Sequence, residues 1–413
     1  MLFPPANRSA ANPRVVVTGV GIITALGYGW RANAEGFRAG RTAFRPVSLF
    51  NVSRQRVRQA AEILLDESLP GTELSSREEK RLDRAAKLLL FATHEAWQAA
   101  GWEGSESLPL VLGTTSGGMS MGESYYQQTT ERPNSHWHQP TRVVQYQAQT
   151  QALQLQTAFE FAGPITIIAN ACASGANAVG HAWSLIRGGQ AERVLTGGYD
   201  ALSQLVFSGF DSLQALSPTQ CRPFDAGRDG LALGEGAAVL TLESLDHARQ
   251  RGAHIVAEIS GYGAATDCHH LTQPHPQGEA ALRAMEKACE AAGVTAENVG
   301  YVNAHGTGTP LNDSAEANAI NQWARAAGCK PRVSSTKASI GHLLGGAGAV
   351  ETAICAMALS EGWLPPTTTI ETVDPLCEFD LVRARTDAQI DYALSNSFGF
   401  GGANASVLLR RWA

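Results

Sequence analysis

The chain has 413 residues and a formal net charge of −6; only 17% of its residues are charged, 44% are apolar and 42 are glycine. This mildly acidic, apolar composition predicts a large packed globule and argues against general affinity for nucleic acid or anionic membrane surfaces. A length of 413 residues exceeds one ordinary hydrophobic core, so we expect two domains or an internally duplicated fold.

The predicted elements alternate between apolar strands and amphipathic helices, which is the pattern of an α/β protein. In the first half, strands are predicted over residues 14–21, 108–113, 164–168, 193–198 and 236–242, and helices over residues 88–100 and from the turn at 171–175 to residue 186.

The second half repeats this order. Residues 255–263 resemble the first strand and its Gly-x-Gly ending, residues 300–306 take the place of the second strand, and residues 332–337 take that of the strand and turn around Cys172. We therefore predict two versions of one α/β unit, residues 1–253 and 254–413. Residues 119–156 and 202–232 are extra segments of the first unit, and such insertions cap active sites or build subunit contacts.

Features of membrane or secreted proteins are not found. The uncharged stretch 161–186 has the length of a membrane span, but it contains Gly163, Pro164 and Asn170, which a lipid-facing helix would not combine. Residues 1–13 lack a basic start and an apolar run, so we expect no signal peptide and a cytoplasmic location. The seven cysteines form no Cys-x-x-Cys pair, and we expect free thiols.

Two motifs have weak functional interpretations. Gly19 and Gly21 follow a strand as in a dinucleotide site, but Thr24 occupies the position of the third glycine, so we interpret the motif as a tight turn. The chain also contains clustered histidines without a cysteine or carboxylate cluster at a zinc spacing, and we predict neither a metal nor another cofactor. These histidines are His136, His138, His269, His270 and His275.

Cys172 is the best candidate for a nucleophile. It lies where an apolar strand ends and a turn of small residues, 171–175, opens a helix. Backbone amides and the helix dipole at such a terminus favour thiolate over thiol, so we expect an anionic sulfur. The same amides can bind an oxyanion.

The second half supplies possible partners for this cysteine. His305 follows a strand among glycines and threonines, and Lys337 and His342 lie at another strand-to-helix turn. If the halves are duplicated, these strand ends converge near the shared axis and bring Cys172, His305 and His342 together. The glycine loop 396–404 can offer a second amide to the oxyanion.

The segments ACASG, RPFDAGRDG, DCHHLT, NAHGTGTP, TKASIGHLLGGAGAVE and NSFGFGGAN resemble successive motifs of β-ketoacyl-acyl-carrier-protein synthases. The resemblance extends from Arg14 to Arg410 and is closest to the synthase II branch of these condensing enzymes. It implies a thiolase-like fold in which two duplicated α/β halves form α-β-α-β-α layers.

The resemblance also implies the chemistry. Cys172 accepts an acyl group from a carrier-protein thioester, with the amides of Cys172 and Phe400 as oxyanion hole. Neutral His305 and His342 then stabilise the enolate that malonyl-carrier protein leaves on losing carbon dioxide. The enolate attacks the acyl-cysteine, and the chain grows by two carbons in fatty acid biosynthesis. Lys337 is expected to pair with Glu351 and to orient the histidine region.

Further roles are carried over by resemblance. The hydroxyl groups of Thr272, Thr307 and Thr309 are expected to hold the pantetheine arm, Phe398 and Phe400 to gate the acyl pocket, and Ser116 to form its floor. Arg77, Lys80 and Arg81 are expected to form a basic patch on one helix face that binds the carrier protein. Glu351 and Asn404 are expected to give structural support.

Several alternatives stay open. The run Leu311-Asn312-Asp313 resembles ketosynthases of type II polyketide and aryl polyene systems, which work with a chain-length-factor subunit. A degradative thiolase needs a second cysteine in a glycine turn, which neither Cys355 nor Cys377 provides, and a chain-length factor itself lacks the nucleophile. We expect acyl carrier protein as partner and a homodimer, or a heterodimer in the polyketide case.

Overall fold

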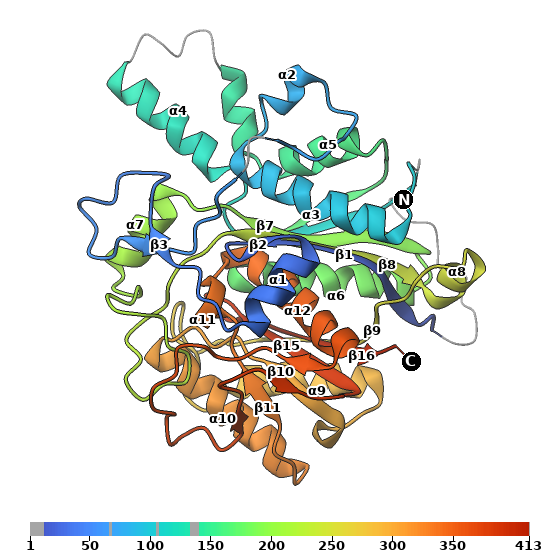
Figure 1. Cartoon of the computed structure of the whole chain (residues 1–413), viewed down its shortest axis with the longest axis vertical. Helices are drawn as coiled ribbons and strands as arrows, with labels where there is room; N and C mark the ends of the chain where they lie inside the picture. The colour runs from blue at the N-terminus through green and yellow to red at the C-terminus, as the bar shows by residue number, and fades with distance from the viewer. Residues whose placement is uncertain (1–11, 66–67, 105–106, 133–139, 413) are drawn as a thin grey trace.

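The computed structural model describes residues 12–65, 68–104, 107–132 and 140–412 of the chain. Within these residues, one twelve-stranded mixed sheet runs through the molecule (Figure 1). The strands follow one another across it in the order β13 (Asp380–Leu381), β11 (Arg332–Ser334), β10 (Val299–Asn303), β15 (Tyr392–Phe398), β16 (Ala403–Arg411), β9 (Ala257–Thr266), β1 (Val15–Thr24), β8 (Gly236–Ser244), β7 (Arg193–Asp200), β5 (Leu110–Gly113) and β6 (Ile165–Ile168), and β2 (Gly27–Tyr28) pairs with β1.

The sheet has two wings with the same construction. Outward from the centre, one wing runs β1-β8-β7-β5-β6 and the other runs β9-β16-β15-β10-β11. The wings join where Val15–Val17 of β1 pair antiparallel with Ala257–Ile259 of β9. In each wing the outer strands are parallel, so their carboxyl ends lie at one edge. The division at residues 253 and 254 stays a prediction.

The helices form three layers around the two wings (Figure 1). α3 (Arg84–Ala100) and α5 (Gln149–Ala158) cover the outer face of the β1 wing, and α9 (Glu279–Ala292) and α10 (Pro310–Ala326) cover that of the β9 wing. α6 (Ser174–Arg187) and α12 (Ala347–Glu361) lie in the central layer, in the largest core. This order of layers confirms the predicted α-β-α-β-α architecture.

The remaining helices are α1 (Gly29–Arg38), α2 (Ser76–Glu79), α4 (Met119–Glu131), α7 (Gln204–Ser212), α8 (Leu245–Gln250) and α11 (Lys337–Ile340), with short 3₁₀ segments at Pro140–Tyr146, Ala171–Ala173, Ala296–Asn298 and Leu344–Gly346. Two small ladders pair β3 (Arg45–Pro46) with β4 (Gln59–Ala60) and β12 (Trp363–Leu364) with β14 (Thr386–Asp387). Among the helices of the described residues, none has both the length and the apolar character of a membrane span.

The Gly-x-Gly motif in the first strand is a helix-packing site, so its interpretation as a tight turn is wrong. Gly19 and Gly21 lie inside β1, and a Cβ on Gly21 would stand 1.8 Å from the carbonyl oxygen of Ala92 in α3. The second wing repeats this arrangement, because a Cβ on Gly263 of β9 would stand 2.1 Å from the carbonyl oxygen of Ala284 in α9. Because glycine has no side chain, each outer helix lies directly on its strand at these positions.

The two central helices also approach each other through glycines. A Cβ on Gly175 of α6 would lie 2.7 Å from the backbone nitrogen of Ala349, and one on Gly348 of α12 would lie 2.5 Å from that of Ala176. α6 follows β6 in one wing, and α12 follows β11 and the short helix α11 in the other wing. Their close contact therefore brings the turn that carries Cys172 next to the turns of the second half.

The predicted basic helix face is not present. α2 is a single turn that begins with a Ser75 capping box and ends at Glu79. Asp83 has an extended conformation and caps the separate helix α3 by accepting a hydrogen bond from the amide of Ala86 at 2.6 Å. Arg77, Lys80 and Arg81 are all exposed, but they lie on this turn and on the connection after it, and α3 begins at Arg84 instead of the predicted residue 88.

Candidate active site

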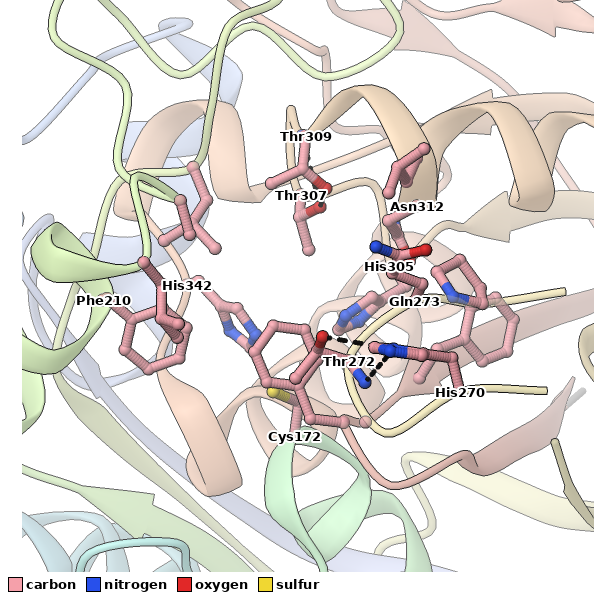
Figure 2. Close-up of a pocket in the computed structure, with 18 of the residues that line it drawn as sticks. Cys172, Phe210, His270, Thr272, Gln273, His305, Thr307, Thr309, Asn312 and His342 are labelled. Carbon is pink, nitrogen blue, oxygen red and sulfur yellow. Dashed lines mark hydrogen bonds between the residues drawn. The ribbon is translucent and has the colours of Figure 1, made fainter. Parts of the chain in front are cut away.

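Cys172, His305 and His342 line one pocket with a volume of about 320 Å³. Cys172 lies in the 3₁₀ turn between β6 and α6, His305 follows β10, and His342 follows α11. Figure 2 shows the sulfur below the two imidazole rings, which face the same space. The three candidate residues, predicted from distant sequence segments, are thus brought together by the fold.

Burial governs the state of Cys172. Its side chain is almost fully covered, and this desolvation raises the pKa of the Cys172 thiol to about 12. The charge of Lys337 and the backbone amides of Phe400 and Cys172, which hydrogen-bond the sulfur, lower that pKa but do not outweigh burial. The predicted resting thiolate is therefore wrong, whereas the two amides expected to form an oxyanion hole do converge on the sulfur.

The two imidazoles are neutral, as expected for hydrogen-bond donors. Burial, followed by the charge of Lys337, lowers the pKa values of His305 and His342 well below the usual value. Their ring centroids are 5.2 Å apart and their planes nearly perpendicular. Nδ1 of His342 accepts a hydrogen bond from the amide of Leu344 at 3.2 Å, so its proton is on Nε2.

The predicted pair of Lys337 and Glu351 is confirmed. The ammonium group of Lys337 donates to the carboxylate of Glu351, and both side chains are buried. Burial raises the pKa of Glu351 to about 7, although Lys337 lowers it. The ammonium group also provides the positive charge that acts on the sulfur and both imidazoles.

The three threonines expected to hold the pantetheine arm all line the pocket. The hydroxyl groups of Thr307 and Thr309 are 2.8 Å apart, and the amide of Thr307 donates to the carboxylate of Asp313. Thr272 belongs to another segment, and its amide donates to Nδ1 of His270 at 3.1 Å (Figure 2). Hydroxyl groups therefore lie on two walls of the pocket.

Phe398 and Phe400, the predicted gate residues, line the pocket, and so does Asn404, for which the sequence predicts only structural support. Phe400 is 42% exposed and stacks on Phe210 of α7, with ring centroids 6.0 Å apart. Sequence reasoning missed Phe210 individually. It lies in the insertion 202–232, one of the segments for which we expect capping of the active site or subunit contacts.

Ser116 is not among the residues that line this pocket, and its place at the floor of the acyl pocket stays a prediction. Its hydroxyl and amide groups both donate to the carboxylate of Asp200, at 2.7 and 2.9 Å. These two hydrogen bonds hold the Ser116 side chain toward the interior of the protein. Sequence reasoning also missed Asp200, because a single aspartate at a strand end has no distinctive motif.

No group of three histidine, cysteine or acidic side chains in the part of the chain that the structure describes is arranged to hold a metal. His269 and His275 pack edge to face, with ring centroids 5.2 Å apart, and His270 lines the pocket. His136 and His138 lie outside the described residues.

Comparisons with known proteins match both halves of the chain. Residues 12–248 match the N-terminal domain of β-ketoacyl synthases and residues 256–371 match their C-terminal domain. The chain belongs to the β-ketoacyl synthase family.

Related proteins match this chain over nearly its whole length. It is 37% identical to 3-oxoacyl-[acyl-carrier-protein] synthase 2 of Synechocystis, over 97% of this chain and 98% of the relative. Among solved structures, the ishigamide ketosynthase/chain length factor has a TM-score of 0.90 and 30% identity, covering 98% of this chain and all of that one. A β-ketoacyl synthase from Burkholderia phymatum has a TM-score of 0.88 and 34% identity, covering 97% and 100%.

Proposed function

We propose that this chain is a 3-oxoacyl-[acyl-carrier-protein] synthase that condenses malonyl-acyl carrier protein with an acyl group held on Cys172 in fatty acid biosynthesis. The observation that carries this proposal is the shared pocket of Cys172, His305 and His342, with two backbone amides on the sulfur. Membership of the β-ketoacyl synthase family supports it. The division into halves 1–253 and 254–413 and the cytoplasmic location stay predictions.

In the first step, Cys172 attacks the thioester carbonyl of an acyl-carrier protein. The new bond joins the sulfur to the acyl carbon, and the carrier thiol departs with the proton that Cys172 gives up. The amides of Cys172 and Phe400 donate to the oxyanion of the tetrahedral intermediate. Because burial raises the pKa of the Cys172 thiol, its proton must leave for the sulfur to attack.

In the second step, malonyl-carrier protein loses carbon dioxide and leaves an enolate. Nε2–H of His342 and an N–H of His305 donate to the thioester oxygen on which the charge develops, and neutral imidazoles suffice for this role. The enolate carbon then attacks the acyl-cysteine carbonyl, the bond to sulfur breaks, and a 3-oxoacyl chain two carbons longer leaves on the carrier protein.

The residues around the pocket suit a long thioester arm. Thr272, Thr307 and Thr309 present hydroxyl groups to the pocket, which fits the amide groups of pantetheine. The proposed docking patch for the acidic carrier protein is the exposed turn that carries the basic residues of 77–81. Lys337, by its charge, supports the neutral state of both imidazoles.

The proposal is tested by intact-mass analysis of the protein after incubation with a panel of acyl-carrier proteins, followed by malonyl-carrier protein. We expect an acyl adduct on wild type and none on Cys172→Ala, and a 3-oxoacyl product from wild type alone. Cys172→Ala should still release carbon dioxide from malonyl-carrier protein. Normal condensation by Cys172→Ala would contradict the assigned nucleophile.

A second candidate is a ketosynthase of a type II polyketide or aryl polyene pathway that works with a chain-length factor. The run Leu311-Asn312-Asp313 favours it, and so does the similarity to the ishigamide ketosynthase/chain length factor. Gel filtration of the chain expressed alone separates the candidates. A homodimer that condenses unaided supports the fatty acid synthase, whereas activity only with a second subunit supports the polyketide enzyme.

A further inference from the structure

Asp200 is a buried carboxylate beside the pocket that the mechanism does not yet use. It is the last residue of β7 and is completely buried. Its two oxygens accept five hydrogen bonds at 2.7–2.9 Å, from Thr114 Oγ1, the amides of Thr115, Ser116 and Gly345, and Ser116 Oγ. Four come from the loop after β5, and one comes from the second half of the chain.

The donors favour the ionised carboxylate, although burial raises the pKa of Asp200. Three of the donors are backbone N–H groups, which cannot accept a hydrogen bond, and they are distributed over both oxygens. No ion pair joins Asp200 to a lysine, arginine or histidine among the described residues. The amides therefore provide its stabilisation, and each such bond is charge-assisted.

The bond to Gly345 connects Asp200 to His342. Gly345 follows Leu344, a non-glycine residue with a positive φ of 51°. The amide of Leu344 donates to Nδ1 of His342, and the next amide along the chain donates to Asp200. Anchoring one amide of this short, unfavourable turn thus fixes the direction of the other.

The same turn touches the helix that follows Cys172. A Cβ on Gly175 of α6 would lie 2.8 Å from the carbonyl oxygen of Gly345, and one on Gly345 would lie 2.4 Å from the amide nitrogen of Thr115. The negative charge of Asp200 is also one of the influences that raise the pKa of Cys172, after burial. Removing this charge alone therefore favours the thiolate.

We propose that Asp200 is a positioning residue: its carboxylate holds the Leu344–Gly345 turn so that the Leu344 amide stays on Nδ1 of His342 and Nε2–H of His342 faces the pocket. The inference rests on the proposed function, because it assigns His342 the task of donating to the malonyl thioester. Asp200 itself touches no reacting atom.

The test is Asp200→Asn, which keeps the size of the side chain but places an amide N–H among donors. We expect kcat for release of carbon dioxide from malonyl-carrier protein to fall at least about tenfold. Alkylation of Cys172 by iodoacetamide at pH 8 should be unchanged or faster. ¹⁵N NMR of labelled histidine should show His342 changing from the Nε2–H form to a mixture of tautomers.

Glu243→Gln is the matched control. Glu243 is as buried as Asp200 and accepts hydrogen bonds from Arg251 and Trp102. None of these three residues lines the pocket. Glu243→Gln should lower stability and leave the ratio of decarboxylation to alkylation unchanged. If Asp200→Asn lowers both rates in parallel, as a general loss of folded protein does, or leaves the His342 tautomer unchanged, the proposal is overturned.

Gly345→Ala is the second variant, to be used if Asp200→Asn does not fold. Its Cβ would collide with the backbone of Thr115, so we expect the hydrogen bond from the amide of residue 345 to Asp200 to break. The same split between decarboxylation and alkylation is expected, and its absence would contradict the proposal. A wild-type protein that neither decarboxylates nor condenses would refute the proposed function, whereas the NMR measurement would still decide whether Asp200 sets the tautomer.

Discussion

At the scale of single residues, burial decides the chemistry of the pocket more than local backbone geometry does. The turn at Cys172 precedes a helix, and amides do reach the sulfur, yet the thiol is neutral because the surrounding chain excludes water. The same exclusion keeps both imidazoles neutral. Burial therefore favours the uncharged forms of all three side chains.

The state of Cys172 predicts the pH dependence of its alkylation. With a pKa of about 12, the thiolate fraction rises about tenfold per pH unit, so inactivation by iodoacetamide should accelerate continuously from pH 7 to pH 10. The exposed Cys268 and the partly exposed Cys329 and Cys377 are replaced by serine to lower the background of alkylation at other thiols. A plateau between pH 7 and pH 9 would mean that the resting sulfur is anionic after all.

The buried pair of Lys337 and Glu351 gives a second prediction. The ordinary pKa of the Glu351 carboxyl is 4.5, and in the folded protein it is about 7. Lys337→Met removes the positive partner of Glu351 and therefore raises this pKa further. Stability then declines as pH rises, because the folded state keeps a proton that the unfolded state has lost. We expect a loss of about 3 kcal/mol in the free energy of unfolding at pH 8 and less at pH 6.

Urea denaturation at both pH values measures this difference. The control is the double variant Lys337→Met/Glu351→Gln, in which the pH dependence should disappear because no ionisable group remains at the pair. An equal loss at pH 6 and pH 8 for the single variant would contradict the assigned ionisation.

At the scale of elements, glycines set the distances between layers. β1 and β9 each carry a Gly-x-Gly motif against an outer helix, and α6 and α12 meet through Gly175 and Gly348. These contacts explain why a glycine-rich chain is so tightly packed. They also explain why the motif in β1, which resembles a dinucleotide turn, has no relation to a cofactor.

Gly21→Ala tests this packing. Its Cβ would lie 1.8 Å from the carbonyl oxygen of Ala92, so α3 must move away from β1, and we expect the protein to lose about 3 kcal/mol of stability or more. Gly209→Ala in α7 is the control, because no atom lies within 4 Å of the added Cβ. It should be neutral or stabilise by about 0.5–1 kcal/mol, as expected for alanine in a helix. Thermal unfolding of both variants measures the contrast, and a small shift for Gly21→Ala would contradict the packing role.

At the scale of the whole molecule, buried carboxylates connect separate layers. Glu243 of β8 accepts hydrogen bonds from Thr18 of β1, from Trp102 after α3 and from Arg251 after α8. Burial alone would raise the pKa of Glu243. The hydrogen bonds from Arg251, Thr18 and Trp102 outweigh burial and lower this pKa to about 2. Stability from this group is therefore present above its ordinary pKa of 4.5 and is lost as pH falls towards 2.

Glu243→Gln should destabilise the protein by about 3 kcal/mol at pH 7 and by about 1 kcal/mol less at pH 4. Denaturant titrations of wild type and variant at the two pH values measure this change. A destabilisation that grows as pH falls would contradict the ionised network.

Much of the molecule follows from the sequence alone. The alternation of apolar strands and helices determined the fold class, because burial on both faces of a sheet requires continuous apolar runs. The cysteine, the two histidines and the lysine were identifiable from their strand-end positions and from family motifs. Such signals are local, and the duplication of the two halves predicted that these strand ends converge near the shared axis.

Only the tertiary structure decided the rest, for a physical reason. The pKa of Cys172, the inward contact of Ser116, the stacking of Phe210 on Phe400 and the five bonds to Asp200 all depend on segments distant in sequence. Desolvation and hydrogen-bond satisfaction are properties of the completed packing, and no short stretch of sequence contains the atoms that cause them.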